Sequence, residues 1–113
     1  MKREDVKTMV QSVGLPCSYY QFPDNTPQSP PFIVWFFSRN MDVYADDSNY
    51  TDKEVLNIEL YTRYRDFEQE QAVEEILSSN GFTYAKEASF IDNEKIWQIS
   101  YESEVIINGE QQG

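Results

Sequence analysis

The clearest alternation of apolar and polar residues in the chain lies near its end, and it restricts the possible folds more than any other feature. Its apolar members are Trp97, Ile99, Tyr101, Val105 and Ile107, and its polar members are Gln98, Ser100, Glu102 and Glu104. A repeat of two residues is the period of a β-strand, in which successive side chains face opposite sides. This segment therefore predicts a strand with one buried side and one polar side.

Four more segments have the composition of strands. They span residues 17–22, 32–37, 54–65 and 82–90. The run from Phe32 to Phe37 is apolar throughout, which predicts a central strand covered on both faces. The other two long segments alternate, and their expected apolar sides are Leu56, Ile58, Leu60 and Tyr64 in one, and Phe82, Tyr84, Ala88 and Phe90 in the other.

Two segments predict helices. The first has an apolar stripe at helical spacing that ends at a glycine and a proline: Val6, Met9, Val10 and Val13, then Gly14 and Pro16. The second begins after Asp66, an N-cap residue with Gln69 three positions on, and ends at Asn80-Gly81. Its apolar side consists of Ala72, Val73, Ile76 and Leu77, with Phe67 as an edge contact.

The predicted order of elements is α-β-β-β-α-β-β. Because consecutive strands are joined mostly by turns and loops, we expect a largely antiparallel sheet with helices packed on one face, an α+β fold. A length of 113 residues fits one domain, residues 1–113, with a frayed tail at 108–113. Residues 23–31 hold four of the five prolines and predict a stiff connector, whereas residues 39–52 form a long polar loop.

The composition excludes several kinds of active site. The chain has no histidine, so it has no Ser-His-Asp triad, no Cys-His pair and no imidazole metal ligand. The single cysteine, Cys17, forms neither an internal disulfide nor a thiolate cluster, and the four glycines form no phosphate-binding loop. We therefore predict a protein that is not an enzyme and that uses no cofactor and no metal.

Acidic residues allow two further interpretations, and neither is supported by spacing. Asp42, Asp46, Asp47 and Asn49 offer oxygen atoms that calcium favours, but they lack the pattern of an EF-hand. Pro23-Asp24 matches half of a restriction-nuclease motif, yet no downstream lysine has an acidic residue two positions before it. A solvated acidic loop is the simpler interpretation.

The net charge of −11 argues against sequence-independent binding of nucleic-acid phosphates. Most of the excess lies late in the chain, since residues 67–113 hold 10 acidic and 2 basic side chains. No apolar run approaches the roughly 18–20 residues of a membrane span. The first residues also lack the apolar core of a signal peptide, so we expect no membrane partner.

With no catalytic group left, binding or assembly is the simplest role. Tyrosine is enriched at protein interfaces, and several tyrosines lie in or beside the long polar loop. The predicted interface residues are Asp42, Tyr44, Asp46, Asp47, Asn49, Tyr50, Tyr61 and Arg63.

Several short motifs are spread along nearly the whole chain. They are Val13-Gly14-Leu15-Pro16, Tyr19-Tyr20-Gln21-Phe22, Pro30-Pro31-Phe32-Ile33, Tyr44-Ala45-Asp46-Asp47-Ser48-Asn49-Tyr50, Ile58-Glu59-Leu60-Tyr61-Thr62, Asp66-Phe67, Ile91-Asp92 and Tyr101-Glu102-Ser103-Glu104-Val105. Together they resemble a family of small proteins encoded by tailed phages and prophages of Gram-positive bacteria. The size and the order of elements are similar to those of tail terminator, or tail-completion, proteins.

The resemblance implies a structural virion protein of the head–tail interface. Its expected form is a sheet flanked by helices, assembled into a homohexameric ring that caps the tail tube and contacts the neck or connector. DNA would pass through such a ring without being bound specifically. The expected location is the virion, and the cytoplasm of the bacterial host during assembly.

The acidic charge fits more than one role. In a ring, acidic side chains that face the lumen would repel the DNA duplex and let it slide. A small acidic inhibitor that mimics DNA, of the anti-restriction or anti-CRISPR type, would have a similar size and charge. A hydrolase that uses carboxylates alone has the weakest support.

Overall fold

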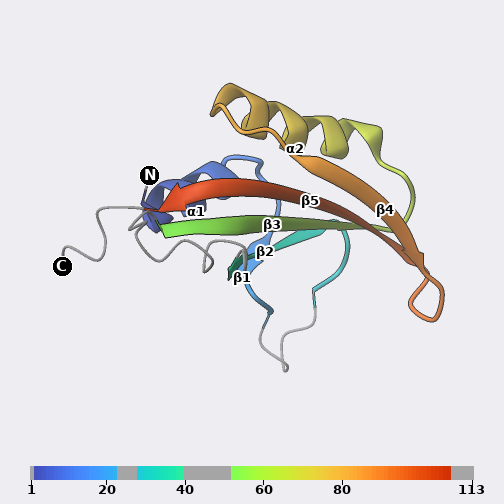
Figure 1. Cartoon of the computed structure of the whole chain (residues 1–113). Coiled ribbons are helices and arrows are strands. Elements are labelled where there is room, and N and C mark those ends of the chain that lie inside the picture. Colours follow the sequence, from blue (N-terminus) through green and yellow to red (C-terminus); the bar gives the residue numbers. More distant parts are fainter. Residues whose placement is uncertain (1, 23–27, 40–51, 108–113) are drawn as a thin grey trace.

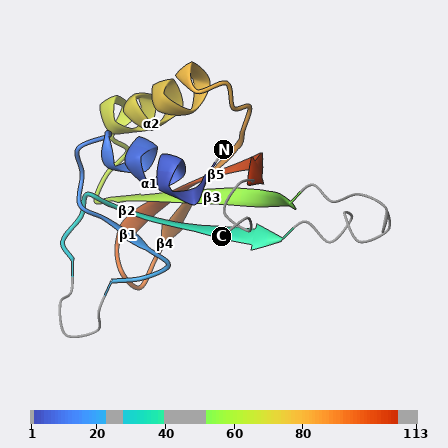
Figure 2. The ribbon, with the colours of Figure 1, turned by 90° about the vertical axis from the view of Figure 1, so that its left-hand side faces the viewer.

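The computed structural model describes residues 2–22, 28–39 and 52–107, which fold into two layers (Figure 1). The elements are α1 (Arg3–Gln11), β1 (Cys17–Tyr19), β2 (Phe32–Arg39), β3 (Asp52–Thr62), α2 (Phe67–Ser79), β4 (Ala85–Ile91) and β5 (Ile96–Ile107). One layer is a five-stranded sheet, and both helices lie on the same side of it (Figure 2). The predicted α+β class and the order α-β-β-β-α-β-β are confirmed.

The strands follow the order β1-β2-β3-β5-β4 across the sheet. Only the short β1 runs parallel to its neighbour, and the other pairs are antiparallel. The longest pairing joins β3 to β5 and runs from Asp52 opposite Ile107 to Thr62 opposite Trp97. The sheet is therefore mostly antiparallel, as the turn-rich connections predict.

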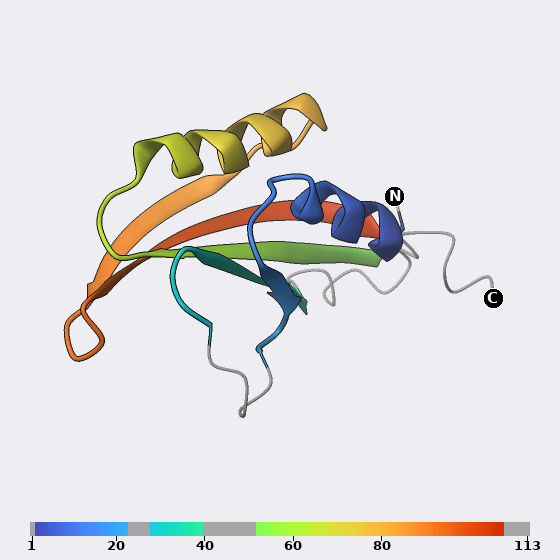
Figure 3. The same ribbon diagram turned by 180° about the vertical axis from the view of Figure 1, so that it is seen from behind.

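The core lies between the sheet and the two helices. The sheet contributes Ile33, Trp35, Leu56, Ile58, Leu60, Ile99, Tyr101 and Val105, and the helices contribute Val6, Met9, Val10, Val73 and Leu77. These positions alternate along β3 and β5, because only every second side chain of a strand faces the helices. Helix α1 covers the side of the sheet near β1 and β2, and α2 covers the side near β4 (Figure 3).

The structure corrects four expectations about individual residues. Segment 17–22 forms a strand only to Tyr19, because Tyr20 has a φ of 76° and turns the chain out of the sheet. Tyr64 lies beyond the end of β3 and is 65% exposed. Phe90 is 44% exposed because β4 is an edge strand whose end extends past α2 (Figure 1). The helices cover one face of β2, so Phe36 on its other face is only half-buried.

Helix α2 begins where the sequence predicts. The carboxylate of Asp66 accepts a hydrogen bond from the backbone N–H of Gln69 at 3.3 Å, which satisfies one of the free N–H groups of the first turn. At the other end, Gly81 has a φ of 84°, a conformation that glycine adopts without strain. Both ends of the helix are thus encoded locally.

The N-cap of α2 gives a simple test of this local encoding. Asp66→Ala removes the acceptor for the Gln69 N–H, so we expect a loss of about 1 kcal/mol of unfolding free energy. Urea denaturation followed by circular dichroism measures this loss. Asp66→Asn keeps a capping oxygen and should lose less than half as much, and equal losses for the two variants would contradict the capping role.

Candidate binding surface

The face of the sheet opposite the helices carries a group of aromatic side chains at its β2 side. Phe32 stacks on Tyr61 across the β2–β3 pair, with ring centroids 4.9 Å apart and an interplanar angle of 22°. Phe22 meets Phe32 edge to face at 5.4 Å, and Tyr20 lies 5.5 Å from Phe36. We call these residues, Tyr20, Phe22, Phe32, Phe36 and Tyr61, the aromatic zone.

Local backbone geometry places the aromatic zone. The N–H of Tyr20 donates to the carbonyl of Trp35 at 2.8 Å, which ties the end of β1 to β2. The positive φ of Tyr20 then directs the following residues across the open face of β2 rather than along it. Phe22 is thereby brought against a strand that begins ten residues later.

A groove of about 370 Å³ lies beside the aromatic zone. Phe22, Phe32 and Tyr61 line one part of it, and Ile91 and Ile96 from the β4–β5 hairpin line another. Two carboxylates, Glu59 and Glu94, also line it, and no Lys or Arg does so among the residues that the structure describes. The groove is therefore apolar in its body and negative in its charge.

Tyr61 links the aromatic and acidic parts of this groove. Its hydroxyl donates to Oε1 of Glu59 at 2.8 Å. Burial is the main cause that raises the pKa of Tyr61, and the hydrogen bond and negative charge of Glu59, with the charge of Glu94, raise it further. The phenol remains protonated at physiological pH, and it experiences both carboxylates of the groove.

A second group of side chains on the open face is acidic. Glu87 on β4 and Glu102 and Glu104 on β5 are exposed, and we call them the acidic zone. Across the sheet, Ser100 on β5 lies between Glu87 on β4 and Glu59 on β3. The row from Glu87 to Glu59 therefore runs from the acidic zone to the edge of the aromatic zone. No Lys or Arg occupies an open-face position within 32–38, 55–61, 85–91 or 96–104.

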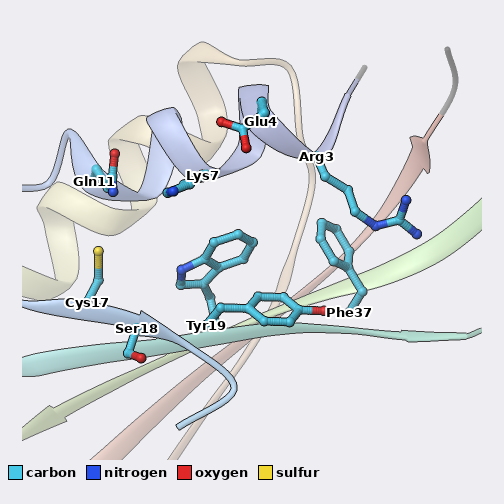
Figure 4. A pocket seen from close by; sticks show the side chains of 9 residues that line it. Arg3, Glu4, Lys7, Gln11, Cys17, Ser18, Tyr19 and Phe37 are labelled. Carbon is cyan, nitrogen blue, oxygen red and sulfur yellow. The ribbon is translucent and has the colours of Figure 1, made fainter. Parts of the chain in front are cut away.

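A different cleft, of about 430 Å³, opens beneath α1 on the helix side of the sheet (Figure 4). Tyr19 and Phe37 lie on one side of it, with Arg3 and Lys7 on the other (Figure 4). Trp35 also lines the cleft and packs against the rings of Tyr19 and Phe37. Arg3 is already engaged, since it pairs with Glu54 at 2.7 Å and lies 5.5 Å from the Phe37 ring. Its charge is therefore largely compensated within the chain.

Cys17 lines the same cleft. Burial raises the pKa of its thiol, and the charge of Lys7 opposes this shift with a smaller effect. The thiolate is the nucleophilic form of cysteine, so this thiol is a weak nucleophile at neutral pH.

A cluster of four charged side chains lies under α2 and joins the helix to β4. Glu70 accepts two hydrogen bonds from Arg65, at 2.9 and 3.0 Å, and pairs with Lys86 at 2.9 Å. Lys86 also pairs with Glu74 at 2.6 Å, and the hydroxyl of Tyr101 donates to Glu74 at 2.8 Å. Each member has a partner, so the cluster serves the packing of α2 rather than chemistry.

The structure describes only two of the interface residues predicted from the sequence. Tyr61 lines the groove on the open face, and Arg63 is exposed just after β3. Asp42, Tyr44, Asp46, Asp47, Asn49 and Tyr50 lie outside the described residues. Of the eight residues, the structure thus locates only Tyr61 and Arg63, and it brings Tyr61 together with residues from other segments; an interface role for any of the eight stays a prediction.

Sequence reasoning missed the partners of Tyr61. Glu59 was recognisable, because it lies two residues before Tyr61 on the mixed face of the same strand. Phe32 was not recognisable as an open-face residue, since the whole of its segment is apolar. Glu94 was not recognisable either, because its approach depends on the β4–β5 turn.

The described residues contain no group of three or more Cys, Asp or Glu side chains that could hold a metal ion. None of the helices in the same part of the chain is long and apolar enough to cross a membrane. Comparisons with protein-family models, with curated proteins and with solved structures found no match.

Proposed function

We propose that this protein is a tail terminator, or a related neck component, of a tailed phage. In this role it forms a homohexameric ring on the end of the tail tube and contacts the neck or connector. The motifs along the chain resemble that family, and the α-β-β-β-α-β-β order agrees with the resemblance. The observation that carries the proposal is the open sheet face, which is aromatic at one side and acidic at the other.

The two edges of the sheet support assembly into a ring. β1 and β4 lie at opposite edges, so a contact from the β4 edge of one copy to the β1 edge of the next would join unlike surfaces. Contacts between unlike surfaces close into rings when the rotation between neighbours permits it. Exposed strand edges carry unpaired backbone groups that favour pairing with another chain.

The acidic zone supports a ring through which DNA passes. Glu87 and Glu102 would repel phosphates if they faced the lumen, and the open-face positions within 32–38, 55–61, 85–91 and 96–104 carry no basic side chain to hold the duplex. Binding of DNA by proteins depends on Lys and Arg at the phosphates. A lumen lined in this way would let DNA slide.

The test is assembly with tail tubes. We expect purified protein to sediment with purified tubes of its phage and to add a ring at one end of each tube in electron micrographs. Free protein that is monomeric by light scattering remains compatible with this result, because the tube can nucleate the ring. Failure to bind tubes of the same phage at micromolar protein would contradict the proposal.

The exposed carboxylates on β4 and β5 also favour a second candidate, an inhibitor that mimics DNA. Such a protein would act as a monomer or dimer and would bind a basic host nuclease. The same sedimentation experiment separates the two candidates, since a DNA mimic has no affinity for tail tubes.

A further inference from the structure

We propose that the groove lined by Tyr61 binds a short basic and apolar segment of a partner protein. In this arrangement an Arg or Lys side chain lies at Glu59 and Glu94, and apolar side chains of the segment pack on the aromatic floor. The inference concerns a single chain and does not depend on the ring. It is tested on the isolated protein.

The floor of the groove suits apolar side chains. Phe22, Phe32 and Tyr61 present ring surfaces from three segments, and Ile91 and Ile96 add aliphatic surface. The volume of about 370 Å³ lies at the lower end of the range of about 300–1,000 Å³ that is typical of ligand pockets. A few side chains of an extended segment fit this space, whereas a whole domain does not.

The negative charge of the groove favours a positively charged ligand. Glu59 and Glu94 are its charged lining residues within the described ranges. Tyr61 donates to only one oxygen of Glu59, and a carboxylate has a second oxygen that accepts hydrogen bonds. A cationic side chain would therefore find an acceptor, while phosphates and acidic segments would be repelled.

The combination of carboxylate and aromatic rings favours arginine over lysine. A guanidinium binds carboxylates with two parallel N–H groups and stacks on aromatic faces, which lysine does less well. In this groove Glu59 stands two residues from Tyr61 on one face of β3, and Tyr61 is stacked on Phe32. One arginine could contact the carboxylate and the rings together.

The experiment uses three labelled peptides and the full-length protein. The probe is a fluorescein-labelled peptide of sequence LRFRL, and the two comparison peptides are LEFEL and SRSRS. Anisotropy titrations at 50 mM salt should give a dissociation constant in the micromolar range for LRFRL. Both comparison peptides should bind at least tenfold more weakly, because each lacks one half of the required chemistry.

A matched pair of variants locates the binding. Glu59→Gln with Glu94→Gln should weaken LRFRL binding at least tenfold, whereas Glu87→Gln with Glu102→Gln removes the same charge elsewhere on the open face and should weaken it less than twofold. Thermal unfolding verifies that both variants are folded. Equal weakening by the two pairs, or no binding of LRFRL to the wild type at 1 mM, would overturn the proposal.

Light scattering tests whether a second copy of this chain, rather than a partner segment, occupies the groove. If the protein self-associates and LRFRL dissociates it, the groove is occupied by a second copy of this chain, and the assignment to a partner segment is wrong. If LRFRL binds without any change in mass, the assignment stands.

Discussion

Glu70→Gln is expected to lower the free energy of unfolding by about 3 kcal/mol, at the lower end of the range for breaking a buried ion pair. The side chain of Glu70 is 2% exposed and holds Arg65 and Lys86 at 2.9–3.0 Å. Glutamine keeps the shape but removes the negative charge, so two cations lose their shared partner. Arg65 and Lys86 are 31% and 33% exposed, and water compensates them in part, which places the loss at that lower end.

Thermal or urea denaturation measures this loss, and a shift of about 12 °C in Tm corresponds to it for a chain of this size. Glu75→Gln is the matched control, since Glu75 lies on the same helix but is exposed. Its effect should stay within about 0.5 kcal/mol. Equal losses for the two variants would show that the buried ion pairs do not hold α2 in place.

The pH dependence of stability gives an independent test of the same residue. The hydrogen bonds from Arg65, and then the contacts with Lys86, lower the pKa of Glu70 below its ordinary value. A lowered folded-state pKa means that the stabilisation is complete above the unfolded-state pKa of about 4.3 and is lost as the pH falls through the folded-state pKa. The difference between wild type and Glu70→Gln should therefore shrink in acid.

Much of the fold follows from periodicity, and the exceptions have physical causes. The alternation along β5 continues through Ser103, which is buried at 4% exposure and donates to the carbonyl of Thr83. The apolar pattern of β4 did not predict burial, because β4 is an edge strand and its end near Phe90 extends past α2, which leaves that end uncovered. Periodicity gives the orientation of a side chain, but the neighbouring elements decide whether it is covered.

Glu70 shows why a polar core residue is difficult to recognise in a sequence. It shares one helix face with Val73 and Leu77, and this spacing places a charge on the buried side. Its partners, Arg65 and Lys86, lie on two different segments, and only the packing of α2 on β4 brings them together. The spacing could have identified the residue, but not its role.

The groove was even less accessible to sequence analysis. Tyr61 was predicted as an interface residue because tyrosine is enriched at interfaces and because its strand adjoins the long polar loop. Its neighbours in the groove depend on two turns. One turn uses a positive φ at Tyr20, which no sequence rule assigns to a tyrosine. The other is the β4–β5 hairpin, which carries Glu94 to the opposite side of the groove.

The second large effect is expected at the acidic zone. Changing Glu87, Glu102 and Glu104 to lysine alters the net charge from −11 to −5 and gathers three cations on one face of the sheet. Three phosphate contacts give a salt slope of about −2.7, so DNA affinity should fall about 40-fold between 50 and 200 mM salt. The variant should therefore bind DNA, whereas the wild type should not. Fluorescence anisotropy with a labelled 20-base-pair duplex measures the affinity of both proteins at the two salt concentrations.

A control variant shows whether an effect comes from the position of the new charges or from the change in net charge. Glu4, Glu68 and Glu75 lie on the helices, and changing them to lysine gives the same net charge on the other side of the sheet. If the open face lines the lumen of a ring, virions that carry the open-face variant should eject DNA more slowly, because the new cations hold the duplex as it passes. Virions that carry the helix variant should eject at the normal rate. Equal ejection by the two would place the acidic zone outside the lumen, even if both variants form rings.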